Sequence, residues 1–289
     1  MTYRLVSLIM ILTTISISIS AKDTSVRVLG PQSKEDVSQD YFYQLLETSI
    51  KMGSSKYIDL KLIDASRLTQ GRTLHLLANK SLDVFWTGTS IERESQFYAI
   101  KIPLMKGLLG YRVSIIKKQN LSTFIALPNK DFKQKIACQG SHWPDTRILE
   151  YNQYRVNPIG RYHAMFEMVS KNRCDYFPRA IFEGYGELKI AQKKFDNLAI
   201  LDDVLLYYPF PIYFFVNKEN TALGHIIENG LEQMIDSGEF DAFMKNHEVT
   251  KHAFPLKKWK SKRIFYLENP FLSEAVDIEN ARYWVTPPQ

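Results

Sequence analysis

One short segment of this chain occurs twice, and the spacing between its copies constrains the fold. Residues 82–85 read LDVF and residues 174–177 read CDYF, so Asp175 follows Asp83 by 92 positions (175 minus 83). Each copy follows a helix-like pattern and a polar turn, and continues as a short strand pattern. Two such copies predict two similar α/β lobes, and a cleft between lobes is a common binding place for small ligands.

The patterns between and around the copies alternate between strands and helices. Apolar residues at helical spacing, closed by Gly53, predict a helix over 40–52. Strands that are separated by helices form βαβ units and parallel sheets. The alternation predicts further strands at 26–29, 57–63 and 82–86 and a further helix at 72–79.

Two longer strand patterns, at 109–116 and 205–216, interrupt this alternation. The second contains Pro209 and Pro211, and proline does not sit within a central strand, so these residues fit a hinge. We therefore expect the chain to cross into a second lobe and back. The expected division is a first lobe of residues 22–113 plus 208–250, a second lobe of residues 114–207, and a tail of residues 251–289 packed on the first lobe.

The first 21 residues form a distinct segment. Arg4 is their only charged side chain, and the apolar run after it is diluted by Ser and Thr. The run is shorter than the roughly 20 apolar residues of a spanning helix. Small residues end at Ser20 and Ala21, where signal peptidase would cut. We expect a cleaved secretory signal peptide over residues 1–21 and a periplasmic product; the alternative is an uncleaved N-terminal anchor.

The charge pattern says little about a macromolecular partner. The formal net charge is +6, and basic residues are mostly interspersed with acidic ones. The one dense basic cluster, residues 257–263, has no wider basic stripe around it. We interpret this cluster as a solvated segment, although it could contact anionic lipid or nucleic acid, and we expect no nucleic-acid partner.

The two cysteines, Cys138 and Cys174, do not form a motif for metal binding or catalysis. Export would permit a disulfide. However, both lie near strands that we expect to be parallel neighbours, which would hold their Cα atoms beyond the roughly 4.4–6.8 Å that bridging requires. We expect two buried free thiols, and neither a metal nor a cofactor.

The order of several segments resembles a known family. Residues 82–93 (LDVFWTGTSIER) combine a strand with a Thr/Ser loop and Glu-Arg, and the chain continues with Pro103, GYR at 110–112 and IACQGS at 136–141. In this order they resemble bacterial extracellular solute-binding protein family 3, the periplasmic amino-acid receptors of ABC transporters. The likeness covers residues 26–248. It implies an α/β fold of two Rossmann-like lobes with mixed sheets, joined by a two-strand hinge, with a ligand cleft between them.

Arg93 is the first candidate for ligand binding. The resemblance implies that this arginine holds a ligand carboxylate, for which a planar guanidinium is suited. Thr89 with Glu92 three residues later matches a capping box, so a helix should begin there and present free N–H groups. The alternative is an arginine in a surface ion pair. Thr87 and Trp86 share the loop, and Trp86 fits the core equally well.

A turn in the second lobe supplies the opposite wall. Pro144 is well placed at the first position of a helix, and the residues before it are Ser141, His142 and Trp143. Ser141 and nearby N–H groups are candidates for the other side of an anionic ligand. Trp143 would offer an apolar wall. His142 is a candidate hydrogen-bonding or pH-sensing group, although a single histidine in a loop is usually only solvated.

At Arg179 the chain departs from the family pattern. The family places an aspartate for the ligand's ammonium group five residues after the second-lobe aspartate, a position that is Ala180 here. Its neighbour is Arg179, and Glu183 follows. Arg93 and Arg179 together suggest a ligand with anionic groups. The alternative is that Arg179 pairs with Glu183 as internal scaffolding.

These residues favour a binding protein without catalytic activity. We expect a periplasmic monomer that captures a small, anionic solute, an amino acid or organic acid, for an ABC permease or a membrane sensor. One alternative is a dehydratase-like enzyme on the same fold, with Glu183 or His142 as its acid or base. Another is an interaction protein with a degenerate cleft.

Overall fold

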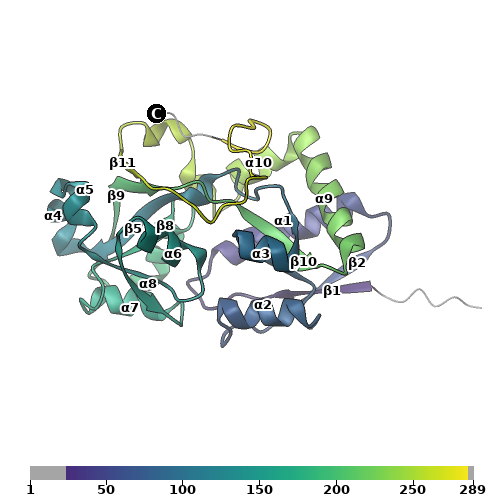
Figure 1. Ribbon diagram of the computed structural model, residues 1–289, viewed down its shortest axis with the longest axis horizontal. Coiled ribbons are helices and arrows are strands. Elements are labelled where there is room, and N and C mark those ends of the chain that lie inside the picture. Colours follow the sequence, from purple (N-terminus) through teal and green to yellow (C-terminus); the bar gives the residue numbers. More distant parts are fainter. Residues whose placement is uncertain (1–23, 286–289) are drawn as a thin grey trace, which may run out of the picture.

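The computed structural model describes residues 24–285 and shows two α/β lobes side by side (Figure 1). The expected signal peptide, residues 1–21, lies outside the described residues. The first lobe contains a parallel pair of strands, β1 (Thr24–Leu29) and β2 (Ile58–Ile63), and an antiparallel sheet in the order β3-β10-β4. The strands of that sheet are β3 (Val84–Gly88), β4 (Phe97–Ile100) and β10 (Ile212–Asn217).

The second lobe is built on a six-stranded mixed sheet in the order β11-β9-β5-β8-β6-β7. Strand β5 runs antiparallel to both of its neighbours, whereas β6 runs parallel to β7 and β8. The strands are β5 (Tyr111–Lys117), β6 (Ile136–Gly140), β7 (Arg155–Ile159), β8 (Tyr176–Ala180), β9 (Leu198–Tyr207) and β11 (Arg263–Tyr266).

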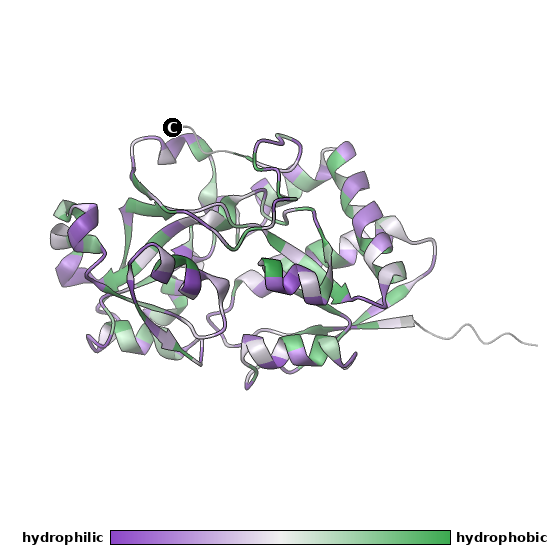
Figure 2. Ribbon diagram, in the orientation of Figure 1, coloured by the Kyte–Doolittle hydropathy of each residue, from purple (hydrophilic) through white to green (hydrophobic). Residues whose placement is uncertain are grey.

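Helices cover both lobes, with their polar residues turned mainly outward while apolar residues follow the strands (Figure 2). The first lobe carries α1 (Ser38–Gly53), α2 (Gln70–Ala78), α3 (Ile91–Gln96), α9 (Thr221–Asp236) and α10 (Glu239–Asn246). The second carries α4 (Leu121–Ala126), α5 (Asn129–Phe132), α6 (Pro144–Tyr151), α7 (Ala164–Ser170) and α8 (Gly184–Ala191). Between residues 24 and 285, no helix has the length and apolar character needed to cross a bilayer.

The aspartates of the internal repeat have the same structural task in both lobes. Asp83 accepts a hydrogen bond from the Arg27 backbone N–H at 2.7 Å, and Asp175 accepts one from the Ile136 N–H at 2.7 Å. In return, each aspartate N–H donates to the carbonyl of the same residue. The carboxylate thus satisfies a backbone donor of another strand, β1 for Asp83 and β6 for Asp175. This shared requirement is a physical reason for the repeated aspartate.

Helices α1 and α9 of the first lobe pack closely against each other. A Cβ atom on Gly53 would lie 1.9 Å from the Ile226 carbonyl oxygen, and one on Gly230 would lie 1.8 Å from the Ser49 carbonyl oxygen. Only glycine permits this approach, so both glycines fix the distance between the helices.

The chain crosses between the lobes at the two patterns that we interpreted as a hinge. Strand β5 enters the second lobe at Tyr111, and the return passes through residues 208–211 between β9 and β10. Pro209 and Pro211 lie in that break, as their exclusion from central strands predicts. The pattern at 205–216 is therefore two strands.

The C-terminal segment packs on both lobes, whereas we expected it to pack on the first lobe alone. Its strand β11 pairs with β9 at the edge of the second-lobe sheet. The segment also contacts the first lobe, where the Phe271 carbonyl oxygen accepts from the Ile91 N–H, Arg282 lies 2.8 Å from Asp236 of α9 and Trp284 packs against Gly107. This segment, yellow in Figure 1, runs along both lobes.

The expectation of free thiols was wrong, because Cys138 and Cys174 form a disulfide with a Cα–Cα distance of 5.6 Å. Strands β6 and β8 are parallel neighbours as we assumed, but Cys174 precedes β8 in a bend that follows α7. Both cysteines belong to the cluster of buried side chains that includes Phe166 of α7. Cys174 therefore lies over the sheet face toward which Cys138 points, and not in line with β8.

Candidate functional site

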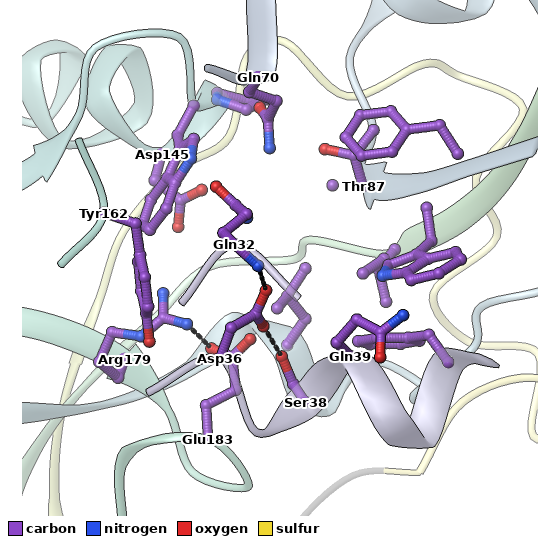
Figure 3. A pocket seen from close by; sticks show the side chains of 18 of the residues that line it. Gln32, Asp36, Ser38, Gln39, Gln70, Thr87, Asp145, Tyr162, Arg179 and Glu183 are labelled. Atoms are coloured by element: carbon purple, nitrogen blue, oxygen red, sulfur yellow. Dashed lines mark hydrogen bonds and ion pairs between the residues drawn. The ribbon is translucent and has the colours of Figure 1, made fainter. Parts of the chain in front are cut away.

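A cavity of about 120 Å³ lies between the lobes and is lined by residues from both. It is large enough for several waters or one small organic molecule. The first lobe contributes the loop after β1, the start of α1 and strand β3, while the second contributes β5, β8 and the start of α6 (Figure 3). Its aromatic walls are Phe42, Phe85, Trp86, Trp143, Tyr162 and Phe210.

Arg93 does not line this cavity, although it is buried at the boundary between the lobes. Its Nη1 donates to Thr87 Oγ1 and to the Gly88 carbonyl oxygen, each at 2.6 Å. Its Nη2 donates to Gln70 Oε1 and, across the lobes, to the His142 carbonyl oxygen at 2.9 Å. Burial lowers the pKa of the Arg93 guanidinium to about 10, so it remains charged at neutral pH. Arg93, which we expected to hold a ligand carboxylate, thus donates four hydrogen bonds to protein oxygens.

Of the other predicted residues of the first-lobe loop, two line the cavity and one supports the loop from behind. Trp86 and Thr87 line the cavity, and Trp86 packs on Phe42 with ring centroids 5.9 Å apart. Thr89 is buried, and its hydroxyl donates to Glu94 Oε1 at 2.8 Å. The N-cap of α3 is Ser90, whose hydroxyl accepts from the Arg93 N–H, so the predicted capping box at Thr89 was shifted by one residue.

The predicted second-lobe residues lie mostly beside a neighbouring cavity of about 250 Å³. Ser141 and His142 are exposed and line this outer cavity together with Arg93, while Trp143 borders both cavities. Pro144 begins α6, as predicted. Arg147 of α6 lies 2.7 Å from Glu92 of α3 and forms a second link across the lobes.

Arg179 lines the central cavity and is paired with carboxylates. Its Nε and Nη2 donate to the two oxygens of Glu187, each at 2.6 Å, and its Nη2 lies 2.9 Å from Glu183 Oε2. The structure therefore contains the Glu183 pairing that we considered as the alternative, and adds Glu187. Burial opposes the charge of Arg179, but the two carboxylates raise its pKa well above the ordinary value.

Sequence reasoning missed a second buried arginine in the cavity wall. Arg112 of β5 is 2% exposed, and its Nη2 lies 2.5 Å from Asp145 Oδ1, which also accepts from Tyr208. The sequence did mark Arg112, because it is the only charged residue in the apolar strand pattern at 109–116. Two of the polar atoms that have no hydrogen-bond partner within residues 24–285 belong to the cavity wall, Arg112 Nε and the Tyr162 hydroxyl.

Asp36 is a further cavity residue that sequence reasoning missed. It lies in the loop between β1 and α1, where it accepts from the Gln32 N–H at 2.9 Å and from the Ser38 hydroxyl at 3.3 Å (Figure 3). Burial and the nearby negative charge of Glu183 raise the pKa of Asp36, although Arg179 and the hydrogen bonds oppose the rise. Nothing in the polar stretch 32–39 distinguished this carboxylate from its neighbours.

No protein family model and no curated protein matches this sequence. Solved structures do match. They include an amino-acid ABC transporter substrate-binding protein from Streptococcus pneumoniae bound to L-arginine, with a TM-score of 0.58, 16% identity and coverage of 80% of this chain and 95% of that chain.

Two further matches are structures of proteins that bind arginine or glutamate. A periplasmic binding protein from Salmonella typhimurium with high arginine specificity has a TM-score of 0.58 and 16% identity, covering 77% of this chain and 98% of that one. The GluR0 ligand-binding core from Nostoc punctiforme, in complex with L-glutamate, has a TM-score of 0.56 and 12% identity, covering 77% and 96%. The predicted α/β fold of two lobes is thereby confirmed: the chain has the bilobed fold of type II periplasmic binding proteins.

Proposed function

We propose that this protein captures a small solute between its two lobes and presents the closed form to a membrane partner, an ABC permease or a sensor. The observation that carries the proposal is the cavity at the lobe boundary, whose walls come from both lobes of a fold that solute-binding proteins use. A solute can favour closure only if it contacts both walls more favourably in the closed form.

The cavity residues have distinct roles in this proposal. Trp86 and Trp143 come from opposite lobes and would enclose the apolar part of the solute. Thr87 and Arg179 would contribute hydrogen bonds, together with Arg112, which completes the polar wall. Arg93 would act mainly by joining the lobes, because its Nη atoms already contact protein oxygens on both sides.

The residues of the outer cavity would contact the solute as it enters the cleft. Ser141 and His142 would contact solute at the cleft entrance, and Thr89 would support the loop that carries Thr87. We further propose that the chain is a divergent relative of extracellular solute-binding protein family 3, exported to the periplasm by residues 1–21 and acting as a monomer.

The first test is to identify a solute that accompanies the native protein. Native mass spectrometry of freshly purified protein should show a bound small molecule, and a thermal-shift screen of amino acids, amines and organic acids should show stabilisation. A solute at 100 times its Kd adds about 2.7 kcal/mol to the free energy of unfolding. Protein that carries no small molecule and responds to no compound of any charge would overturn the proposal.

A further inference from the structure

The cavity contains more carboxylates than guanidinium groups. Asp36, Asp145 and Glu183 line it, whereas the lining cations are Arg112 and Arg179. The described residues just behind the wall do not change this difference, because Glu187 on one side is balanced by Arg93 on the other. With all these groups ionised, the site carries one unit of negative charge in excess.

The two arginines are engaged by acidic partners and offer little net attraction to an anion. Arg179 contacts Glu187 through two hydrogen bonds and Glu183 through an ion pair. Arg112 contacts Asp145 at 2.5 Å. Each arginine therefore balances a carboxylate of the second lobe, and the carboxylate that stays without a guanidinium contact is Asp36 of the first lobe.

Asp36 and Glu183 come from opposite lobes and meet at one corner of the cavity. Figure 3 shows Asp36, Glu183 and Arg179 gathered there, with Ser38 and Gln32 bonded to the Asp36 carboxyl group. The negative charge of Glu183 raises the pKa of Asp36, so the two carboxyl groups repel each other when both are ionised. Their proximity in this form carries an electrostatic cost, which Arg179 at the same corner offsets in part.

Two buried polar groups in the same wall indicate that the cavity is built for a polar solute. Tyr162 is 8% exposed and Arg112 is 2% exposed, and both line the cavity. The Tyr162 hydroxyl and Arg112 Nε have no hydrogen-bond partner among residues 24–285. Leaving a buried polar group unsatisfied is costly, so a solute that contacts these groups would gain stability from them.

We propose that the solute carries a net positive charge, and that its ammonium or guanidinium group lies between Asp36 and Glu183. The cation relieves the repulsion between the lobes, so it stabilises the closed form more than the open form. The aromatic rings of Phe42 and Trp86 line the same cavity and suit the apolar stem of such a solute. This inference rests on the proposed function, and it replaces the anionic solute that the two arginines suggested.

The test compares solutes of similar shape and different charge. Isothermal titration and thermal shift would be measured with L-arginine, its uncharged-side-chain analogue L-citrulline, its decarboxylated form agmatine, and L-glutamate. We expect arginine or agmatine to bind at least about tenfold more tightly than citrulline, as a charge-assisted hydrogen bond implies, and glutamate to bind least. Equal binding of arginine and agmatine would support the proposal, because agmatine lacks the carboxylate and keeps the cationic guanidinium group.

Variants assign the effect to the two carboxyl groups. Asp36→Asn and Glu183→Gln should each reduce the preference for the cation over citrulline about tenfold, whereas Asp59→Asn, on the exposed face of β2, should not change it. The preference is a ratio within one variant, so it does not depend on small losses of stability. Citrulline or glutamate binding as tightly as arginine and agmatine would overturn the cationic solute while retaining solute binding. Absence of any binding would count against the proposed function itself.

Discussion

Arg93 of the first lobe donates a hydrogen bond to the His142 carbonyl oxygen of the second lobe at 2.9 Å. The same guanidinium also holds Thr87, Gly88 and Gln70 of its own lobe. A residue that we expected to hold the ligand instead joins the lobes beside the cavity. Burial of the charged Arg93 guanidinium carries a desolvation cost, and the several hydrogen-bond acceptors around it offset that cost.

Replacing Arg93 should therefore weaken the closed form. Arg93→Ala leaves four acceptors without their donor, and we expect a loss of about 2–3 kcal/mol in the free energy of unfolding. Urea denaturation measures this loss. Arg147→Ala is the matched control, because its exposed ion pair with Glu92 also links the lobes but should contribute less than about 1 kcal/mol. A larger effect for Arg147→Ala would contradict the role of Arg93.

The disulfide should contribute substantially to the stability of the second lobe. Cys138 and Cys174 are 36 residues apart in sequence, and a bridge that closes a loop of this size typically stabilises by about 2–4 kcal/mol. We expect dithiothreitol to lower the Tm of the native protein. The Cys138→Ser/Cys174→Ser variant should have a lower Tm that dithiothreitol does not change. Intact-mass measurement before and after alkylation would show whether free thiols are present, and two free thiols would disprove the bridge.

The pH dependence of stability should report on Asp36. Its pKa is raised in the native protein by burial and by Glu183, while Arg179 opposes the rise. The native state therefore binds a proton more readily than the unfolded state does. As the pH rises from the ordinary pKa of 3.8 through the raised pKa of native Asp36, the contribution of this group to the free energy of unfolding falls.

The variant Asp36→Asn should remove this contribution. We expect the difference in free energy of unfolding between native protein and Asp36→Asn to change across that pH window and to be constant above it. Urea titrations at several pH values would measure the difference. A difference that does not vary with pH would show that Asp36 titrates normally.

The contact between Trp284 and Gly107 can be tested with a matched pair of glycines. Gly107 has φ +84°, and a Cβ atom there would lie 2.2 Å from the Trp284 ring. Gly238 has a similar φ of +79° but nothing within 4 Å of its Cβ position. Gly238→Ala should cost about 1 kcal/mol from backbone strain alone. Gly107→Ala should lower the free energy of unfolding clearly more, because it also displaces Trp284. Urea denaturation measures both losses, and equal losses would show that Trp284 does not pack against Gly107.

The fold was predictable because its signals are local. The repeated Asp83 and Asp175, the alternation of patterns and the prolines at 209 and 211 each reflect one backbone requirement that the sequence must meet at that position. The tail was harder, since the pairing of β11 with β9 joins residues that are about 60 positions apart, and no local pattern specifies the partner.

The candidate site was less predictable, for a physical reason. From the sequence we considered Arg179 a cation available to the ligand. In the structure its charge is balanced by Glu183, which we considered as the alternative, and by Glu187 one helical turn further on. The charge of a site depends on all the groups that converge on it, and Asp36 and Arg112 reach the cavity from distant segments. Similarly, the bend at Cys174 decides the disulfide, and strand order alone does not reveal it.

The segment after β11 sets a limit on how far the lobes can separate. Tyr266 belongs to the second-lobe sheet, and the Phe271 carbonyl oxygen accepts from the Ile91 N–H of the first lobe. Five peptide units can span at most roughly 18 Å. The molecule therefore has a third tether outside its hinge, and a full swing must first release Phe271 from α3. The range of lobe opening would then be limited by the length of chain between Tyr266 and Phe271.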